Sequence, residues 1–220
     1  MDDLGIPLTG QEGAQVDDES QYIELLIQAT LNEKNSPEIL EFEEGLVTSL
    51  ERSLKEKEEQ VEGLESAGTQ ELERMIYSLE VKRVRYLLKL YYRTRLHKIE
   101  KYAAAILDDE AQASKLSQAE LQFCQDYFVT VGRHLKEVVL DQLNEDFKPL
   151  CKTSALSDTN DLIPRPPMDT HVFAKLVADA GAVKLDDDGG TMVDMAAGDL
   201  FIVRYAPVAH LVARRDAVLV

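Results

Sequence analysis

The chain has 220 residues, of which 45% are hydrophobic, and a formal net charge of −17 at pH 7. This composition is that of one large or two small globular domains, and the negative charge argues against general DNA or RNA binding, because nucleic-acid phosphates repel it. No stretch approaches the roughly 18 apolar residues of a membrane helix, and the acidic first residues are unlike a signal peptide, so we expect an intracellular protein.

The first part of the chain predicts an acidic tail and two helices. Residues 1–19 contain no basic side chain and no extended helical stripe, which predicts a disordered acidic tail. From residue 20 the apolar positions recur at helical spacing, and the predicted helix ends near Asn32 to Asn35. Ser36 followed by Pro37 is typical of a helix cap and first turn, so we expect a second, highly charged helix to begin there and to continue through Leu64.

The longest helical pattern runs from Gln70 to at least Gln112 without Gly or Pro. At 100° per residue its apolar side chains share one face about 140° wide. These residues are Tyr77, Val81, Val84, Leu87, Leu88, Tyr91, Tyr92, Ile99 and Tyr102. Beside this face lies a basic stripe made of Lys82, Arg85, Lys89 and Arg93.

The basic stripe contrasts with the rest of the chain. Residues 1–80 carry 21 acidic and 5 basic side chains, whereas residues 81–102 carry 8 basic and 1 acidic. The segment predicts a solvated face, a protein interface or a nucleic-acid surface, and of its aromatic residues only Tyr86 lies toward the basic side.

Arg95 falls in the middle of the apolar face of this helix. A buried guanidinium costs several kcal/mol unless a hydrogen-bonded carboxylate lies against it, so the position requires an acidic partner. The Glu residues of the second helix, or a partner chain, are the candidates for this carboxylate.

The second half of the chain predicts one more helix and a small β domain. Ser117 and Glu120 form a capping box that begins a fourth helix. Four prolines then forbid a continuous helix in the linker region. Period-two patterns follow at 171–177, 182–185, 200–205 and 217–220, with a helical turn at 207–213 and a turn at 188–190.

The predicted fold class is therefore mainly α with a small C-terminal β domain (α+β). We expect a tail at 1–19, a helical bundle-like A domain at 20–146, a linker at 147–168 and a β-rich B domain at 169–220. A β domain of this size buries little apolar surface, so it should dock on something.

The sequence shows no catalytic, cofactor or metal signature. The four histidines lie on different elements, and neither they nor Cys124 and Cys151 have the spacing of a metal or redox site. Residues 186–189 lack the alternating ligands of a calcium loop, and no phosphate-binding, nucleophile-elbow or zinc-protease motif occurs. We therefore expect neither an enzyme nor a bound cofactor.

Three blocks of the sequence follow the pattern of a known protein family. Residues 32–40 read N-E-K-N-S-P-E-I-L, and residues 163–173 read I-P-R-P-P-M-D-T-H-V-F. They resemble the N-E-K-x-x-P-E-L-L and V-P-x-P-x-L-D-x-x-V-F of the Sld-five type subunit of the eukaryotic GINS complex. The third block is the helix that marks the family. Its residues include Arg85, Tyr86, Arg93, Arg95, Lys98, Ile99, Glu100 and Lys101, which we take as candidates for a subunit interface or structural charge pairing.

The resemblance implies a nuclear, non-catalytic subunit in a complex of four related chains. The family implies that this complex joins the MCM ring and a RecJ-like cofactor protein in the active replicative helicase, with replicative polymerases as further partners and only indirect or weak DNA contact. It also implies that a tail peptide binds a hub of the Ctf-four type, through Asp2, Asp3, Leu4, Ile6 and Leu8. The alternatives are a nucleic-acid-binding module that uses helix 82–101, and a generic coiled-coil scaffold.

Overall fold

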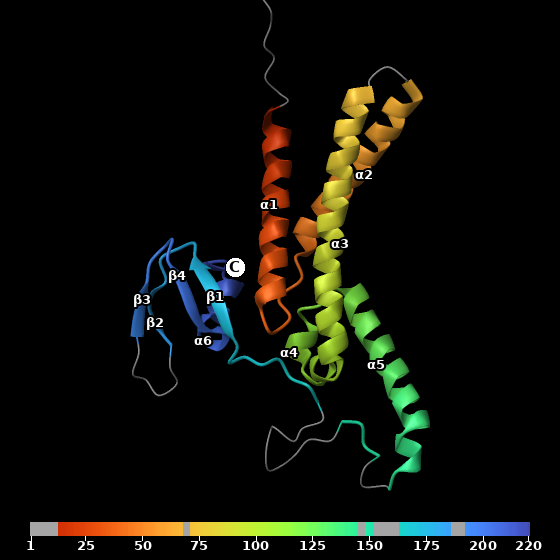
Figure 1. Cartoon of the computed structure of the whole chain (residues 1–220), viewed down its shortest axis with the longest axis vertical. Coiled ribbons are helices and arrows are strands. Elements are labelled where there is room, and N and C mark those ends of the chain that lie inside the picture. Colours follow the sequence, from red (N-terminus) through yellow and green to blue (C-terminus); the bar gives the residue numbers. More distant parts are fainter. Residues whose placement is uncertain (1–12, 68–70, 145–147, 152–162, 186–191) are drawn as a thin grey trace, which may run out of the picture. The chain divides into compact units, whose positions relative to one another are not determined.

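The computed structural model describes residues 13–67, 71–144, 148–151, 163–185 and 192–220 (Figure 1). All but one of the described helices precede the strands, as the sequence predicts for an α+β chain with a C-terminal β domain. The helices are α1 (Gly13–Asn35), α2 (Glu44–Ala67), α3 (Glu71–Asp108), α4 (Glu110–Ala113), α5 (Gln118–Val138), the 3-10 helix η1 (Leu140–Gln142) and α6 (Tyr205–Ala213). The strands are β1 (His171–Leu176), β2 (Gly181–Lys184), β3 (Met192–Met195), β4 (Leu200–Arg204) and β5 (Ala217–Leu219).

The chain forms two compact units, and α1 and α3 contribute to both. One unit contains the residues up to Gln28 together with Gly45–Leu88, and the other contains Ala29–Glu44 and Lys89–Val220. In the first unit, the buried apolar side chains are Leu26, Val47, Leu50, Val81, Val84 and Leu88. Ion pairs between α2 and α3 flank this core.

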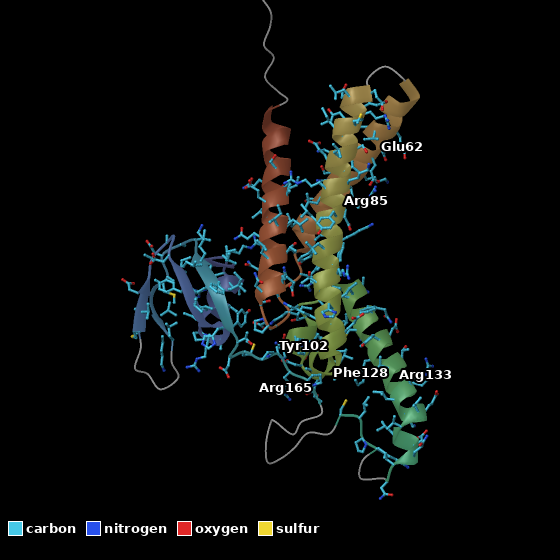
Figure 2. The ribbon with its side chains drawn as sticks, in the orientation of Figure 1. Glu62, Arg85, Tyr102, Phe128, Arg133 and Arg165 are labelled. Atoms are coloured by element: carbon cyan, nitrogen blue, oxygen red, sulfur yellow. The ribbon has the colours of Figure 1, made fainter. Side chains whose placement is uncertain are left out.

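The helical part of the second unit has its own apolar cluster. Ile39, Ile99, Tyr102, Ala103, Ile106 and Cys124 are buried together. Phe128 of α5 packs against this cluster, and Figure 2 labels it close to Tyr102 of α3. The capping box at the start of α5 is confirmed, because the Ser117 side chain accepts a hydrogen bond from the Glu120 amide and the Glu120 side chain accepts one from the Ser117 amide.

Two helix boundaries differ from the sequence predictions. The second helix begins at Glu44 rather than at Pro37. Residues 36–43 are irregular because their backbone carbonyls bind side chains: the Glu38 and Leu40 carbonyls accept hydrogen bonds from Lys98 and Arg95. The third helix ends at Asp108 because the Asp109 side chain caps α4, so the pattern to Gln112 is not one helix.

α1 begins at Gly13, inside the range predicted as a disordered tail. The predicted domain boundaries otherwise stay predictions, and residues 1–12 and the predicted turn at 188–190 lie outside the described residues.

The β domain contains a three-stranded antiparallel sheet in the order β4-β1-β5 and a two-stranded antiparallel pair, β2-β3 (Figure 1). Four of its strands lie where the sequence predicts them, whereas β3 was missed. The predicted helical turn is the nine-residue helix α6. Its buried side chains pack with the inner residues of the sheet in a single apolar core.

No helix in the described ranges is long and apolar enough to cross a membrane. Among the same residues, no three His, Cys, Asp or Glu side chains are grouped so that they could hold a metal ion.

Candidate functional site

Arg95 lies at the centre of a buried charge cluster, and its side chain is 0% exposed. Its Nε and Nη2 donate to the two carboxylate oxygens of Glu120 at 2.8 and 3.0 Å. Nη1 donates to Glu33 Oε2 at 3.0 Å and to the Leu40 carbonyl at 2.8 Å, and Nη2 donates to the Lys115 carbonyl at 3.1 Å. These bonds use all five N–H groups of a guanidinium.

The carboxylates that neutralise Arg95 come from the end of α1 and the start of α5. They do not come from the acidic second helix, whose Glu residues were candidates from the sequence. Glu120 has two functions, since its Oε2 also accepts a hydrogen bond from the Ser117 amide in the capping box. The same residue therefore stabilises the start of α5 and fixes α5 against α3.

Lys98 extends the cluster by one helical turn. Its Nζ donates to Glu33 Oε1 at 2.8 Å, to Ser36 Oγ at 2.8 Å and to the Glu38 carbonyl at 2.7 Å. Lys115 in turn pairs with Glu38 at 2.7 Å. The cluster thus combines three cations with three carboxylates, and every buried side-chain nitrogen or oxygen in the described part of the chain has a hydrogen-bond partner.

Burial and charge act in opposite directions on the titration of these cations. Burial lowers the pKa of Arg95, but the hydrogen bond to Glu120 and the charge of Glu33 outweigh it, and the pKa is raised overall. For Lys98 burial outweighs the attraction of Glu33, and the pKa is lowered. The two directions agree with the geometry, because Arg95 is held by two carboxylates and Lys98 by one.

Aromatic rings close the apolar side of the Arg95 guanidinium. Its Cζ lies 5.3 Å from the centre of the Phe42 ring and 5.7 Å from that of Tyr91. Burial raises the pKa of Tyr91 to about 12. The rings exclude water from the cluster, which strengthens its ion pairs.

The β domain docks on residues 32–43, next to the charge cluster. The Tyr205 hydroxyl donates to Glu38 Oε1 at 2.9 Å, and the Leu219 amide donates to Asn32 Oδ1 at 2.8 Å. Leu40 packs against the apolar core of the β domain, and Arg215 pairs with Glu43. Burial and the Glu38 carboxylate raise the pKa of Tyr205. The segment that supplies Glu33 to Arg95 is therefore also the platform of the β domain.

A second candidate surface lies on the first half of α3, where large apolar side chains are exposed. Leu72 is 74% exposed and Leu79 is 65% exposed, and Met75 and Ile76 between them are about half exposed. At 100° per residue these four residues fall within an arc of about 100°. Val81 and Val84, which are buried, lie on the opposite side of the same helix. This part of α3 consequently has one apolar face inside the chain and another facing outward.

The remaining candidate residues of α3 are spread over different environments. Ile99 is buried in the apolar cluster of the second unit. Tyr86 and Arg93 are exposed, and Arg85 forms an ion pair with Glu58 of α2 at the surface. Figure 2 labels Arg85 on α3. Glu100 and Lys101 are exposed at the edge of a groove of about 240 Å³ between α3 and α5.

Among the candidates, then, the structure unites Arg95 and Lys98 in one cluster and leaves the others apart. The tail candidates lie outside the described residues. Sequence reasoning missed Glu33, Glu120 and Tyr205 as members of this site. The sequence carried a signal for two of them, because Glu120 lies in the capping box and Glu33 lies in the block at 32–40.

Comparison with known proteins places both parts of the chain in one family. Residues 15–139 match the model described as GINS complex protein helical bundle domain, and residues 166–220 match that of the DNA replication complex GINS protein SLD5 C-terminus. The chain belongs to the SLD5 family of GINS complex subunits. Its relatives include the DNA replication complex GINS protein SLD5 of Arabidopsis thaliana, 32% identical over 86% of this chain and 87% of the relative. The human protein of that name is 29% identical, and the match covers 97% of this chain and 95% of the human chain.

The blocks that resemble the SLD5 family coincide with the cluster and its surroundings. The block at 32–40 supplies Glu33 and Glu38, and the block at 85–101 supplies Arg95 and Lys98. The third block, 163–173, includes the first residues of β1. In this SLD5-type chain, the family blocks therefore mark the contacts that join the C-terminal part of α3 to the β domain platform.

Proposed function

We propose that this chain is a non-catalytic subunit of a four-chain GINS complex in the nucleus. In this proposal the complex joins the MCM ring and its RecJ-like cofactor in the active replicative helicase, at initiation and at the moving fork. ATP hydrolysis belongs to the MCM ring, and the chain contributes binding surfaces. Membership of the SLD5 family and the family names of its relatives support this assignment.

The observation that carries the proposal is the outward apolar face of α3, formed by Leu72, Met75, Ile76 and Leu79. Single exposed apolar side chains are common, but four on one helical face form a contiguous patch that is typical of a protein interface. The same helix already buries its opposite face. A helix of a partner subunit packed against the outward face would complete a layer that the chain leaves open.

Co-expression with the three other GINS subunits tests this proposal. The double variant Leu72→Ser/Leu79→Ser should reduce recovery of the three partners by at least tenfold. Because both side chains are exposed, the free energy of unfolding of the chain should change by less than about 0.5 kcal/mol. Val129→Ser on α5, where Val129 is 62% exposed, is the matched control and should retain the partners. Full recovery with the double variant would contradict the proposal.

A nucleic-acid contact is the second candidate function, and one observation favours it. Between Lys82 and His97, the exposed residues of α3 are lysine, arginine or histidine, apart from Tyr86. Titration with single- and double-stranded DNA over a salt series distinguishes this function, since phosphate contacts give a steep salt dependence. At a net charge of −17 we expect the isolated chain to bind weakly or not at all.

The tail peptide remains a separate proposal. A synthetic peptide of residues 1–12 should bind a Ctf-four type hub through Leu4, Ile6 and Leu8, and replacing these three residues by Ser should abolish binding. A replicative polymerase is a further partner that pull-down with the assembled complex would test.

A further inference from the structure

The three-stranded sheet of the β domain has a covered and an uncovered face. Along β1, Val172, Ala174 and Leu176 are buried and pack with α6, whereas the residues that alternate with them are exposed. The outer face of the sheet is formed by these alternating residues of β1, by the corresponding residues of β4 and β5, and by Val177 and Val220 just beyond the strands. They include Phe173, Lys175, Val177, Leu200, Ile202, Val218 and Val220.

The strand register joins the apolar residues of the outer face into a row. Phe173 lies opposite Ile202, and the Val220 amide donates to the Phe173 carbonyl at 3.0 Å. These three side chains are 51%, 63% and 61% exposed, respectively. Adjacent side chains on one face of a sheet contact each other, so the row is a continuous apolar strip rather than scattered residues.

Lys175 stands in the next row of the outer face and lies opposite Leu200 on one side and Val218 on the other. No ion pair joins it to a carboxylate within the described ranges. Arg204, further along the face, differs because it lies 3.9 Å from Asp169. The centre of the face is therefore apolar with one exposed positive charge.

Docking of the β domain on the rest of the chain does not use this face. The contacts with residues 32–43 come from Tyr205, Arg215, the Leu219 amide and the inner core that receives Leu40. The outer face is thus a surface separate from that platform.

We propose that the outer face of this sheet is a docking surface for another subunit of the GINS complex. The docking segment places apolar side chains over Phe173, Ile202 and Val220 and a carboxylate against Lys175. This inference rests on the proposed function, because it requires an assembled complex. Charge complementarity selects the occupant: a second copy placed face to face would bring two Lys175 ammonium groups into one apolar patch without a carboxylate.

A site-specific cross-link in the assembled complex tests the proposal. The full chain is co-expressed with the three other GINS subunits, with the photoreactive p-benzoylphenylalanine in place of Phe173. Placing it at Met192, which is 65% exposed on β3 of the other sheet, gives the matched control. Position 173 should give at least five times the yield of cross-links to another subunit, on a peptide that contains Asp or Glu. Lys175→Glu should lower this yield at least fivefold, and Lys175→Arg should preserve it.

Three results would overturn the proposal: equal yields at the two positions, cross-links to a second copy of this chain, or a cross-linked peptide without acidic residues. Gel filtration separates this failure from that of the proposed function. If the four-subunit complex forms but position 173 shows no preference, only the docking surface is wrong. If no complex forms with the unmodified chain, both fail.

Discussion

The two halves of α3 differ in where their side chains find partners. From Lys89 onward the helix buries Arg95 and binds each of its N–H groups within the chain. Before Leu88 it exposes Leu72 and Leu79, and Arg85 pairs with Glu58 only at the surface. One half of the helix is thus completed by its own chain and belongs to the fold. The other half leaves apolar side chains exposed, and we propose that a partner subunit covers them.

Of the substitutions that test this contrast, Arg95→Ala should have the largest effect on stability. Removing the guanidinium leaves Glu120 buried without a counter-charge and Glu33 paired with Lys98 alone, which should destabilise the chain by about 3 to 5 kcal/mol. Urea unfolding followed by circular dichroism measures the loss, and insoluble protein would be the extreme form of the same result. Arg93→Ala, at an exposed position two residues earlier, is the control and should cost less than about 0.5 kcal/mol. Equal effects at the two positions would remove the distinction between the halves.

Alkaline pH provides a second test of the completed half. The pKa of Tyr91 is about 12 in the folded chain against 10.0 when unperturbed. Its contribution to stability is therefore fully present below pH 10 and is lost as the pH rises toward 12, by at most about 3 kcal/mol. Unfolding measured from pH 9 to 12 should show a smaller loss for Tyr91→Phe than for the unmodified chain. Lys98 and Tyr205 titrate in both variants, so the difference isolates Tyr91, and parallel curves would contradict the prediction.

Asn32→Ala tests whether polar groups beside the charge cluster behave like Arg95. The substitution leaves the buried Leu219 amide without its acceptor, which should cost about 1 to 2 kcal/mol. Hydrogen exchange at the Leu219 amide should accelerate at the same time, because β5 loses the bond that holds its edge to α1. Asn35→Ala, at the end of the same helix, should leave this exchange rate unchanged. Unaltered exchange in Asn32→Ala would show that the β domain is held by other contacts.

Arg85→Ala, in the first half of α3, should have the smallest effect on stability. Exposed ion pairs are worth about 0 to 1 kcal/mol, because water solvates both charges and salt screens them. We expect a loss below about 0.5 kcal/mol that disappears at 1 M salt, measured by the same urea unfolding. A loss comparable to that of Arg95→Ala would mean that the first half of α3 also depends on internal pairing.

The sequence predicted the elements of this fold better than their junctions. Some features are local and can be read from a short stretch of sequence. They are the helical and strand periodicity, the capping box at Ser117 and the need of Arg95 for a carboxylate. The source of that carboxylate is not local, because Glu33 and Glu120 approach Arg95 only once three segments are packed. Likewise, the start of α2 moves from Pro37 to Glu44 because distant side chains occupy the carbonyls of the intervening segment.

The outward face of α3 was also not predicted, for a related reason. The periodicity of the helix highlighted the face that contains Val81 and Val84. That face is buried within the chain. Leu72, Met75, Ile76 and Leu79 precede the strongest part of the pattern, and only packing shows which of two apolar faces is already covered. The interface residues of the family block, such as Tyr86 and Arg93, remain predictions.

The docking of Tyr205 and Leu219 on Glu38 and Asn32 has a consequence for biosynthesis. A ribosome makes the receiving segment well before the two docking residues, so a nascent chain carries an uncovered Leu40 until the β domain has been translated. A prematurely terminated product would keep this apolar side chain accessible and lack the contact that covers it. Chaperones and proteases that bind exposed apolar residues would then distinguish chains with a folded β domain from chains without one before assembly begins.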